Sequence, residues 1–468
     1  MWRGAENRQC STLHSFQKLF GYDKIKMFKP SATDMQRTAG LRMDFFVTGI
    51  IRRQEMVLRR KYMEPKKDRT ILHCDCNGFY ASVECVQRPE LRNVPMAVGG
   101  DAQSRHGIIL AKNELAKQYD VKTAETIWQA KQKCPGLVIV PPRHHLYQQY
   151  SNMVNQIYGE YTEQVEKFGI DESYLDVTGS RRLFGDGETI ANTLRERIKT
   201  ETGLTISVGV SFNKVFAKLG SDYKKPDAVT VISRENYQRI VYPLPVSALL
   251  FVGKRTEQTL AKLYIRTIGD LAAADVGLLV KKLGKNGALL SKYARGEDEE
   301  PVRSVYDQEE VKSVGNSITF RRDLVGEEEI KAGIRAIAES VAARLRRKNL
   351  QCTTVQVIIK NPDFKSISRQ KPLPAPSYLE REISDAAMEI IRENWNMRLP
   401  VRMLSVTGLH LVDAGQGRQL TLFDETEAQE RIENLEKTLD SLRERYGKDI
   451  VKAGNLLSSD FIAKGKKD

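Results

Sequence analysis

Cysteine is scarce in this sequence, which has only six cysteines among 468 residues. They do not form the paired C-x-x-C spacings of a zinc site, and a chain of this size does not depend on a disulfide framework. Free cysteines usually behave as small buried hydrophobic residues. We therefore expect buried thiols in a reducing compartment at Cys10, Cys74, Cys76, Cys85, Cys134 and Cys352.

Long hydrophobic runs are also missing. None approaches the roughly 18 residues that a membrane span needs. The short apolar run 45–51 is followed by two arginines, whereas a secretory signal carries its charges before the apolar stretch. We therefore expect a cytoplasmic protein with no membrane partner.

Acidic residues are outnumbered, with 60 Asp and Glu against 74 Lys and Arg and a net charge of +14. A basic excess favours a polyanionic partner, but it fits nucleic acid, an anionic membrane surface or a merely solubilising surface. Hydrophobic residues make up 41% and charged residues 29%, which is a globular balance. The length allows about three domains of roughly 150 residues each.

The first half of the chain alternates strand-like and helix-like segments, as an α/β or α+β sheet domain does. An apolar strand ends at Asp75 after a segment, 1–68, that shows no sustained period. The pattern predicts strands at 70–75, 165–170, 174–177 and 205–210, and helices at 111–119, 126–133, 147–164 and 190–200.

The second half contains two further units. Residues 243–297 are helical, with predicted helices at 249–263 and 276–294 that each contain a Gly-Lys turn. Residues 311–413 have a β-α-β-β-α-β order. Its predicted strands are 312–320, 353–360, 365–369 and 402–411, its helices are 327–347 and 378–394, and a charged helix follows at 431–446.

Three features carry chemistry. Asp75 closes an apolar strand, and an aromatic pair follows it at 79–80. Asp171 and Glu172 are adjacent acids between two strand-like runs, where a turn or bulge lets neighbours converge. A basic stretch, 213–218, follows a later strand, and Lys225 comes shortly after it.

Carboxylates from two strands can hold the hard oxygen-ligated Mg²⁺ ion, and a pair of ions can assist phosphoryl transfer. Lysines can neutralise a triphosphate. The competing interpretation is a solvated hairpin tip at 171–172 and a turn or capping role for Asp75, since turns accept Asp freely.

The segments 75–84, 169–176 and 213–218 and the pair Lys225-Pro226 resemble, in order and spacing, the Y-family (translesion) DNA polymerases. The closest match is the bacterial DNA polymerase IV class, and the resemblance covers residues 70–423. It implies an α+β multidomain right hand. The implied domains are a palm (69–76 and 144–232), fingers (77–143), a helical thumb (233–299), a linker (300–310), a little-finger DNA-binding domain (311–413) and a tail (414–468).

The resemblance also assigns roles to residues. Asp75, Asp171 and Glu172 match the catalytic, metal-binding carboxylates for two Mg²⁺ ions, which Mn²⁺ can replace, and the backbone carbonyl of Cys76 is a further ligand. Tyr80 matches the steric gate that excludes a 2′-hydroxyl, although a core aromatic is the alternative. The implied nucleotide-binding residues are Phe79, Lys117 and Lys225.

Two departures from the family pattern stand out. Many members have Tyr and Arg in the fingers to grip phosphates, whereas the equivalent positions here are Glu114 and Lys117. Lys117 still supplies charge, but Glu114 would repel phosphate if it pointed inward. Residues 1–68 match nothing in the family, and a natural start at Met63 leads us to expect that they do not fold with the enzyme.

The implied partners are primer–template DNA, deoxynucleoside triphosphates and the bacterial sliding clamp, with a monomeric enzyme near the nucleoid. Helix-hairpin-helix-like turns at Gly253-Lys254 and Gly284-Lys285 suit DNA phosphates. The segment 419–423 resembles a clamp-binding peptide, although an edge strand or packing on the preceding domain also fits its alternation. Its expected anchors are Gln419, Leu420, Leu422 and Phe423.

The sequence thus predicts low-fidelity primer extension past damaged template bases, without a proofreading exonuclease. Two rivals remain at this stage. A binding-only assembly factor is disfavoured because all three acids are present. A nucleotidyl cyclase is disfavoured because it would leave residues 243–413 unexplained.

Overall fold

The computed structural model describes residues 68–100, 107–307, 310–414, 426–447 and 450–451. Residues from Arg69 onward form one compact unit, and its domains are described in turn. The predicted N-terminal extension, apart from residue 68, and the clamp-binding peptide at 419–423 lie outside the described residues. Among the residues that are described, no helix combines the length and apolar character of a membrane span.

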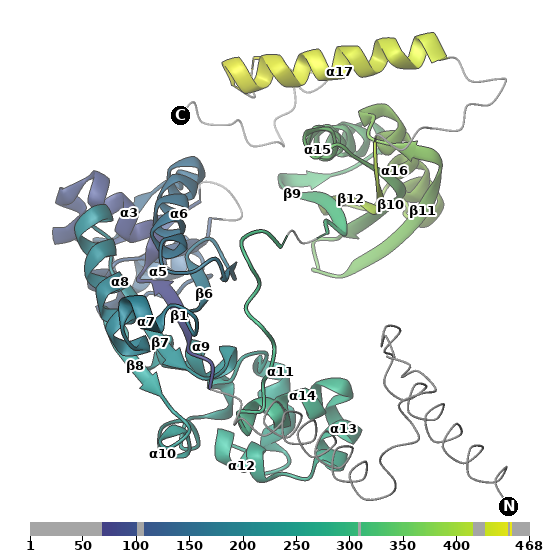
Figure 1. The fold of residues 1–468 in the computed structure, drawn as a ribbon. Coiled ribbons are helices and arrows are strands. Elements are labelled where there is room, and N and C mark those ends of the chain that lie inside the picture. Colours follow the sequence, from purple (N-terminus) through teal and green to yellow (C-terminus); the bar gives the residue numbers. More distant parts are fainter. Residues whose placement is uncertain (1–67, 101–106, 308–309, 415–425, 448–449, 452–468) are drawn as a thin grey trace, which may run out of the picture. The chain divides into compact units, whose positions relative to one another are not determined.

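The first domain is built on a five-stranded sheet with the order β5-β6-β1-β7-β8 (Figure 1). β1 lies at the centre and pairs antiparallel with both β6 and β7, while β7 and β8 are parallel. The strands are β1 (Ile71–Cys76), β5 (Val165–Lys167), β6 (Glu172–Asp176), β7 (Ile206–Ser211) and β8 (Val229–Ile232).

Helices cover both faces of this sheet, so all six residues of β1 are buried. Leu72 and Cys74 face the core formed with α6 (His144–Gly159) and α8 (Gly187–Thr202). Ile71 joins Ala217 of α9 (Lys214–Tyr223) on the other face. Because side chains alternate along a strand, Asp75 lies on the α9 face.

The contact between α9 and β7 depends on glycine. A Cβ added to Gly209 would lie 1.8 Å from the backbone oxygen of Ala217 and 2.4 Å from the backbone nitrogen of Ser221. The helix backbone therefore rests directly on the strand, which fixes the height of α9 above the sheet.

Residues 77–143, which are predicted to form the fingers, contain a three-stranded sheet of order β3-β2-β4 that the sequence analysis missed. Its strands have only three or four residues, which is too short for a detectable period. The predicted helix 111–119 was wrong at its start, because its first two residues end β3 and Asn113 caps α4. The elements are α3 (Phe79–Gln87), η1 (Pro89–Asn93), β2 (Met96–Gly99), β3 (Ile109–Lys112), α4 (Glu114–Gln118), α5 (Ile127–Lys133) and β4 (Val138–Val140).

Two further boundaries differ from expectation. The helix predicted at 147–164 is α6, which begins and ends earlier, and β5 follows it after a loop. The two acids were placed at the hairpin tip, but Glu172 is the first residue of β6, and the backbone N–H groups of Phe168 and Gly169 donate to its carbonyl.

Residues 233–299, which are predicted to form the thumb, contain only short helices. The helix predicted at 249–263 begins only at Lys254, and the one predicted at 276–294 is two helices separated at Gly284, whose φ is 64°. A left-handed φ is easily adopted by glycine, so this break has a local cause. The helices of this unit are α10 (Tyr237–Val241), η2 (Val246–Ala248), α11 (Lys254–Ala261), α12 (Ile268–Ala273), α13 (Val276–Leu283) and α14 (Lys285–Ala294). The short helix α7 (Arg181–Phe184) lies earlier in the chain, directly before α8.

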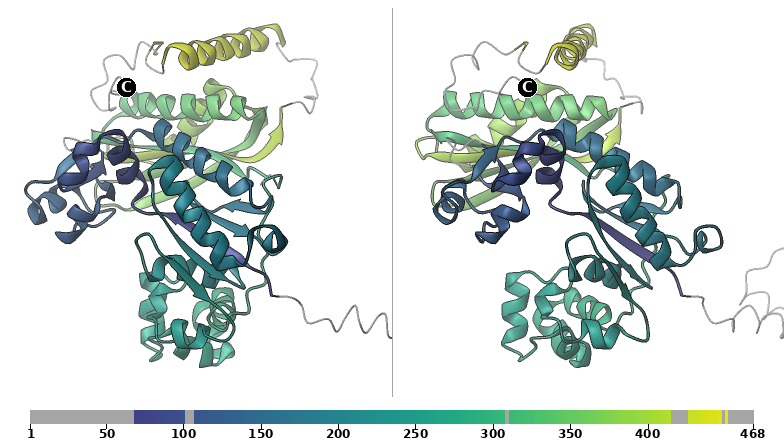
Figure 2. Two further views of the ribbon diagram at one scale, coloured as in Figure 1. Left: turned by 60° about the vertical axis from the view of Figure 1, so that its left-hand side comes forward. Right: turned by 90° about the vertical axis from the view of Figure 1, so that its left-hand side faces the viewer.

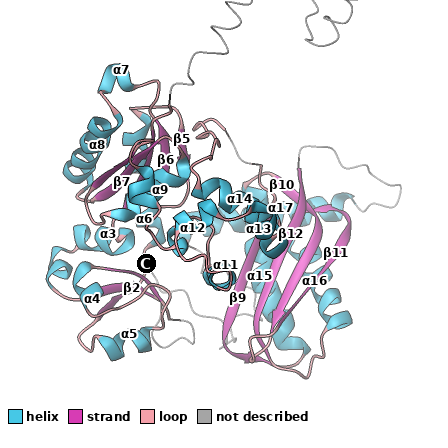
Figure 3. Ribbon diagram, turned by 90° about the horizontal axis from the view of Figure 1, so that it is seen from below, coloured by secondary structure: helices cyan, strands magenta, loops and turns pink. Residues whose placement is uncertain are grey.

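The C-terminal domain has the predicted β-α-β-β-α-β order, and its antiparallel sheet runs β11-β10-β12-β9 with α15 and α16 on one face (Figure 3). β11 is longer than the predicted strand and contains three prolines. The prolines are tolerated because β11 is an edge strand, where a missing N–H costs no ladder bond. The elements are β9 (Ser313–Leu324), α15 (Glu327–Arg347), β10 (Leu350–Lys360), β11 (Ser366–Ser377), α16 (Glu380–Asn394) and β12 (Val401–Asp413).

A final helix, α17 (Thr426–Tyr446), lies beside α15 (Figure 2). The largely buried guanidinium of Arg346 on α15 forms ion pairs with Glu436 and Asp440 of α17. The predicted charged helix is therefore attached to this domain by charge as well as by apolar packing.

The expectation that the cysteines are buried thiols is confirmed for the five that the structure describes. All five are buried free thiols. Cys10 lies outside the described residues.

We predict that Gly209→Ala lowers the free energy of unfolding by about 3 kcal/mol, because a Cβ at this position must push α9 off β7. Thermal and urea unfolding of the purified variant measure this. Gly159→Ala is the matched control, since no atom lies within 4 Å of the added Cβ there. Equal stability of the two variants would show that the helix–strand contact is looser than described.

Candidate active site

Three carboxylates meet at one end of the central sheet. Asp75 near the end of β1 lies directly opposite Glu172 at the start of β6 in the antiparallel register. The backbone N–H of Cys76 donates to the carbonyl of Asp171 across 3.0 Å. Asp171 belongs to the hairpin loop rather than to β6, so it is free of the strand alternation that would turn two neighbours to opposite faces.

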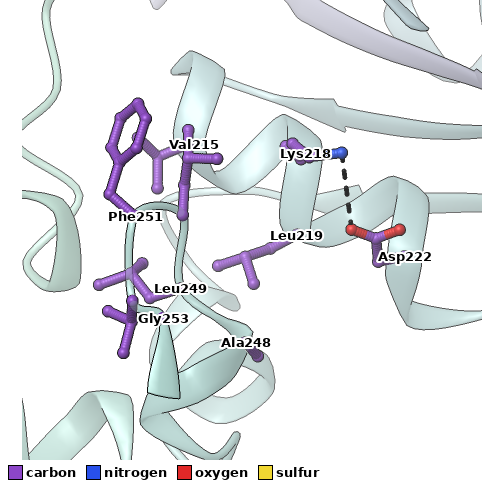
Figure 4. A pocket seen from close by; sticks show the side chains of 10 residues that line it. Val215, Lys218, Leu219, Asp222, Ala248, Leu249, Phe251 and Gly253 are labelled. Atoms are coloured by element: carbon purple, nitrogen blue, oxygen red, sulfur yellow. Dashed lines mark ion pairs between the residues drawn. The ribbon is translucent and has the colours of Figure 1, made fainter. Parts of the chain in front are cut away.

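Two lysines neutralise part of this charge. Lys225 Nζ lies 2.6 Å from Asp75 Oδ2, and Lys218 Nζ lies 2.9 Å from Glu172 Oε2. Asp222 contacts both lysines, at 2.7 Å from Lys225 and 3.8 Å from Lys218, the second of which is drawn in Figure 4. Lys218 and Asp222 are four residues apart on α9, which places them on one helix face.

Burial and mutual repulsion make the acids unequal. Burial raises the pKa of Asp75 against the opposing effect of Lys225. Burial also raises the pKa of Asp171, and the charge of Glu172 adds to the rise. Burial alone would raise the pKa of Glu172, but the nearby His73 ring and the hydrogen bond from Lys218 bring it below its usual range. The pKa values of Asp75 and Asp171 therefore stay raised although Lys225 and Lys218 lie near the acids.

His73 was not singled out from the sequence. Its ring is fully buried, with Nδ1 2.8 Å from Ser221 Oγ and Nε2 3.5 Å from Glu172 Oε2. Burial lowers the pKa of His73. The signal that could have found it is the two-residue spacing to Asp75, which puts both side chains on the same strand face.

Lys218 was also missed as a site residue, although it lies in the basic stretch. Its neighbour Lys214 is buried and pairs with Glu166 at 2.9 Å, so the two lysines of this stretch have different roles. The four-residue spacing from Lys218 to Asp222, just before Lys225, is the pattern that marks the helix face directed at the acids.

The donor set suits a hard divalent cation, which prefers carboxylate oxygens. In the part of the chain that the structure describes, no three His, Cys, Asp or Glu side chains are grouped closely enough to enclose a metal ion. Two of the three acids are instead directed at lysine ammonium groups. Burial raises the pKa values of Asp75 and Asp171, and the positive charge of a bound divalent ion would favour their ionised forms.

The two aromatic residues after β1 lie in different surroundings. Tyr80 is half-buried, and burial and the charge of Asp171 raise its pKa. Its ring stacks on Tyr147 at a centroid distance of 4.1 Å. The Phe79 side chain is buried in the core, so the predicted nucleotide contact at this residue is restricted to its backbone.

Glu114 and Lys117 form an exposed ion pair of 3.4 Å on α4. The charge of Glu114 is therefore balanced by Lys117.

The two glycines of the predicted Gly-Lys turns lie at helix starts. Gly253 caps α11 and Gly284 caps α14, so Lys254 and Lys285 are the first residues of these helices. A cavity of about 330 Å³ lies between the α9 residues Val215, Lys218, Leu219 and Asp222 and the segment 248–253 (Figure 4). The cavity therefore lies between α9, which carries Lys218, and the turn before α11.

Comparison with known proteins shows the family of the chain. Residues 74–222 match the model of the impB/mucB/samB family, and residues 311–422 match the model of its C-terminal domain. A DNA polymerase IV of Acetivibrio thermocellus is 49% identical over 389 residues, which cover 83% of this chain and 98% of the relative.

The chain belongs to the Y-family of DNA polymerases.

Other comparisons agree with this membership. A DNA polymerase IV 1 of Bacillus subtilis is 37% identical over 85% of this chain and 95% of the relative. A solved Y-family DNA polymerase chimera has a TM-score of 0.65 and 25% identity, and the match covers 74% of this chain and 99% of that one. The predicted α+β fold class is confirmed.

We predict that Asp171→Ala raises the free energy of unfolding of the metal-free protein by about 1 kcal/mol, because it removes a partly buried charge that Glu172 repels. Asp176→Ala is the control on the same hairpin. Its carboxylate accepts hydrogen bonds from the backbone N–H and the hydroxyl of Thr178, so its loss lowers stability. Calorimetry in the presence of a chelator measures both variants, and a destabilised Asp171→Ala protein would contradict the repulsion.

Proposed function

We propose that this chain is a template-directed DNA polymerase that adds deoxynucleotides to a primer 3′-end, including opposite damaged template bases. The observation that carries the proposal is the register that sets Asp75 opposite Glu172 with Asp171 beside them. The activity of its relatives, which are named DNA polymerase IV, agrees with it.

Asp75, Asp171 and Glu172, with the carbonyl of Cys76, are the groups that would hold two Mg²⁺ ions, with Mn²⁺ as a substitute. Such ions activate the attacking hydroxyl and stabilise the leaving oxygen in phosphoryl transfer. The protein contributes rigidity, because Asp75 and Glu172 lie on paired strands whose register cannot slip without exposing buried side chains.

The lysines around the acids have a second role. Lys225 and Lys218 contact the carboxylates through flexible side chains. When a triphosphate and its cations enter, these ammonium groups are free to turn toward phosphate oxygens, where Lys acts as a point charge. Lys117 supplies a further charge from the fingers, without the bidentate geometry of Arg.

The remaining assignments concern sugar and DNA. Tyr80, beside Asp171, is the steric gate that excludes a 2′-hydroxyl. The N–H groups at the starts of α11 and α14, at Gly253-Lys254 and Gly284-Lys285, bind DNA phosphates. Low fidelity and the absence of proofreading follow from membership of the family.

We predict that Asp75→Ala and Glu172→Ala each reduce primer extension by at least roughly 1000-fold, because the phosphoryl-transfer site loses a charged ligand. Primer–template binding, measured by fluorescence anisotropy, persists in both variants. A variant that retains full extension would disprove the assignment of that residue. If the wild-type chain binds primer–template but never extends it, the binding-only rival is correct.

Tyr80→Ala is expected to raise ribonucleotide insertion relative to deoxynucleotide insertion by roughly 100-fold, since only the bulk of the ring excludes the 2′-hydroxyl. Single-nucleotide insertion kinetics with both sugars measure the ratio. Tyr119→Ala, at an exposed tyrosine of the fingers, is the control and leaves the ratio unchanged. An unchanged ratio in Tyr80→Ala means that another residue is the gate.

The peptide 419–423 is the proposed docking segment for the sliding clamp, with Leu422 and Phe423 as apolar anchors and Gln419 and Leu420 beside them. We predict that the double variant Leu422→Ala, Phe423→Ala loses clamp stimulation by on the order of tenfold while retaining clamp-free extension. Processivity assays with and without loaded clamp test this. Equal stimulation would exclude docking, and lost clamp-free activity would indicate that these residues pack on the domain.

A further inference from the structure

Tyr147, which stacks on the proposed gate residue Tyr80, is held in a defined position by its neighbours. Tyr80 and Glu84 lie four residues apart on α3, so their side chains share one face of the helix, about 6 Å apart along its axis. The first turn of α6 packs against this face and brings Tyr147 between them. One side chain of α6 thus contacts both residues of α3.

Each end of Tyr147 has a different function in this contact. Its ring stacks on the ring of Tyr80, with centroids 4.1 Å apart and an angle of 17° between the planes. Its hydroxyl donates to Glu84 Oε1 across 2.7 Å. Tyr147 is completely buried, so the surrounding side chains restrict the rotation of its ring.

Glu84 is itself fixed. Its side chain is fully buried, and Arg143 donates from Nε across 3.0 Å and from Nη2 across 2.6 Å to its two oxygens, while Arg88 adds a further ion pair. Burial alone would raise the pKa of Glu84, but the hydrogen bonds from Arg143, Tyr147 and Arg88 lower it. The carboxylate is therefore a charged, immobile anchor for the Tyr147 hydroxyl.

Among the residues that the structure describes, Tyr80 has no comparable anchor of its own. It is only half-buried, and its other aromatic neighbours meet it at larger distances, with His144 at 5.9 Å edge-on and Phe79 at 5.7 Å. Of these three aromatic contacts, the stack on Tyr147 is the closest to the Tyr80 ring. The orientation of Tyr80 thus depends on the position of Tyr147.

We propose that Tyr147, anchored by Glu84, is the positioning residue that holds the Tyr80 ring where it excludes a 2′-hydroxyl, an inference that rests on the function proposed above. Tyr147 acts through Tyr80 and does not touch the substrate. Sugar discrimination is therefore set by two helices, α3 and α6, that are far apart in the sequence.

Single-nucleotide insertion with matched deoxy- and ribonucleotides tests this. Tyr147→Leu removes the stack and is expected to lower the deoxy-to-ribo ratio of kcat/KM by about 3- to 10-fold, the factor that corresponds to the usual strength of an aromatic pair. Tyr147→Phe keeps the ring and loses only the anchor, so its expected loss is smaller, about twofold. A graded loss, Leu greater than Phe, supports the proposal.

Tyr150→Leu is the control on the same helix. Tyr150 is buried and accepts a hydrogen bond from Gln87, away from the gate, so its loss weakens α6 without releasing Tyr80. An equal fall of the ratio in Tyr150→Leu and Tyr147→Leu would overturn the proposal, because it would indicate general loosening. If Tyr147→Leu does not fold, Tyr147→Phe decides, and an unchanged ratio in that variant overturns it.

Tyr80→Ala in the same assay separates the gate role of Tyr80 from the positioning role of Tyr147. If the wild type inserts deoxynucleotides and Tyr80→Ala lowers discrimination while Tyr147→Leu does not, the positioning role fails and the proposed function stands. If Tyr80→Ala leaves discrimination unchanged, the gate assignment fails and the positioning role fails with it.

Discussion

The antiparallel pairing of β1 with β6 is the constraint on which the site depends. It sets Asp75 opposite Glu172 and ties the backbone of Cys76 to that of Asp171. Every residue of β1 is buried, so a shift of one residue would move His73 and Asp75 to the face of Leu72 and Cys74. The position of the acids is therefore stabilised by the same apolar packing that stabilises the domain.

The acids lie close together at some cost to folding, and α9 offsets part of it. The helix rests on β7 at Gly209, which brings Lys218 and the following Lys225 to the carboxylates. These ion pairs balance the charge of the metal-free protein, yet the pKa of Asp171 remains raised. Sites built for function commonly retain strain of this kind, because the charge that relieves it arrives with the substrate.

Much of this arrangement could be predicted from the sequence, and the limits have physical causes. The strand ending at Asp75, the β-α-β-β-α-β domain and the carboxylate set were visible because long periodic segments and an ordered series of motifs are strong signals. The fingers sheet was missed because strands of three or four residues have no period to detect. The Glu84–Tyr147 contact was missed because it joins residues 63 positions apart, and neither spacing nor composition reveals such a pair.

The decisive experiment is single-nucleotide insertion by the wild-type chain, titrated with Mg²⁺ on an intact and on a damaged template. We expect no product without a divalent cation and a saturable rise in product on both templates as Mg²⁺ is added. Tight primer–template binding with no insertion on either template at any Mg²⁺ concentration would contradict this expectation.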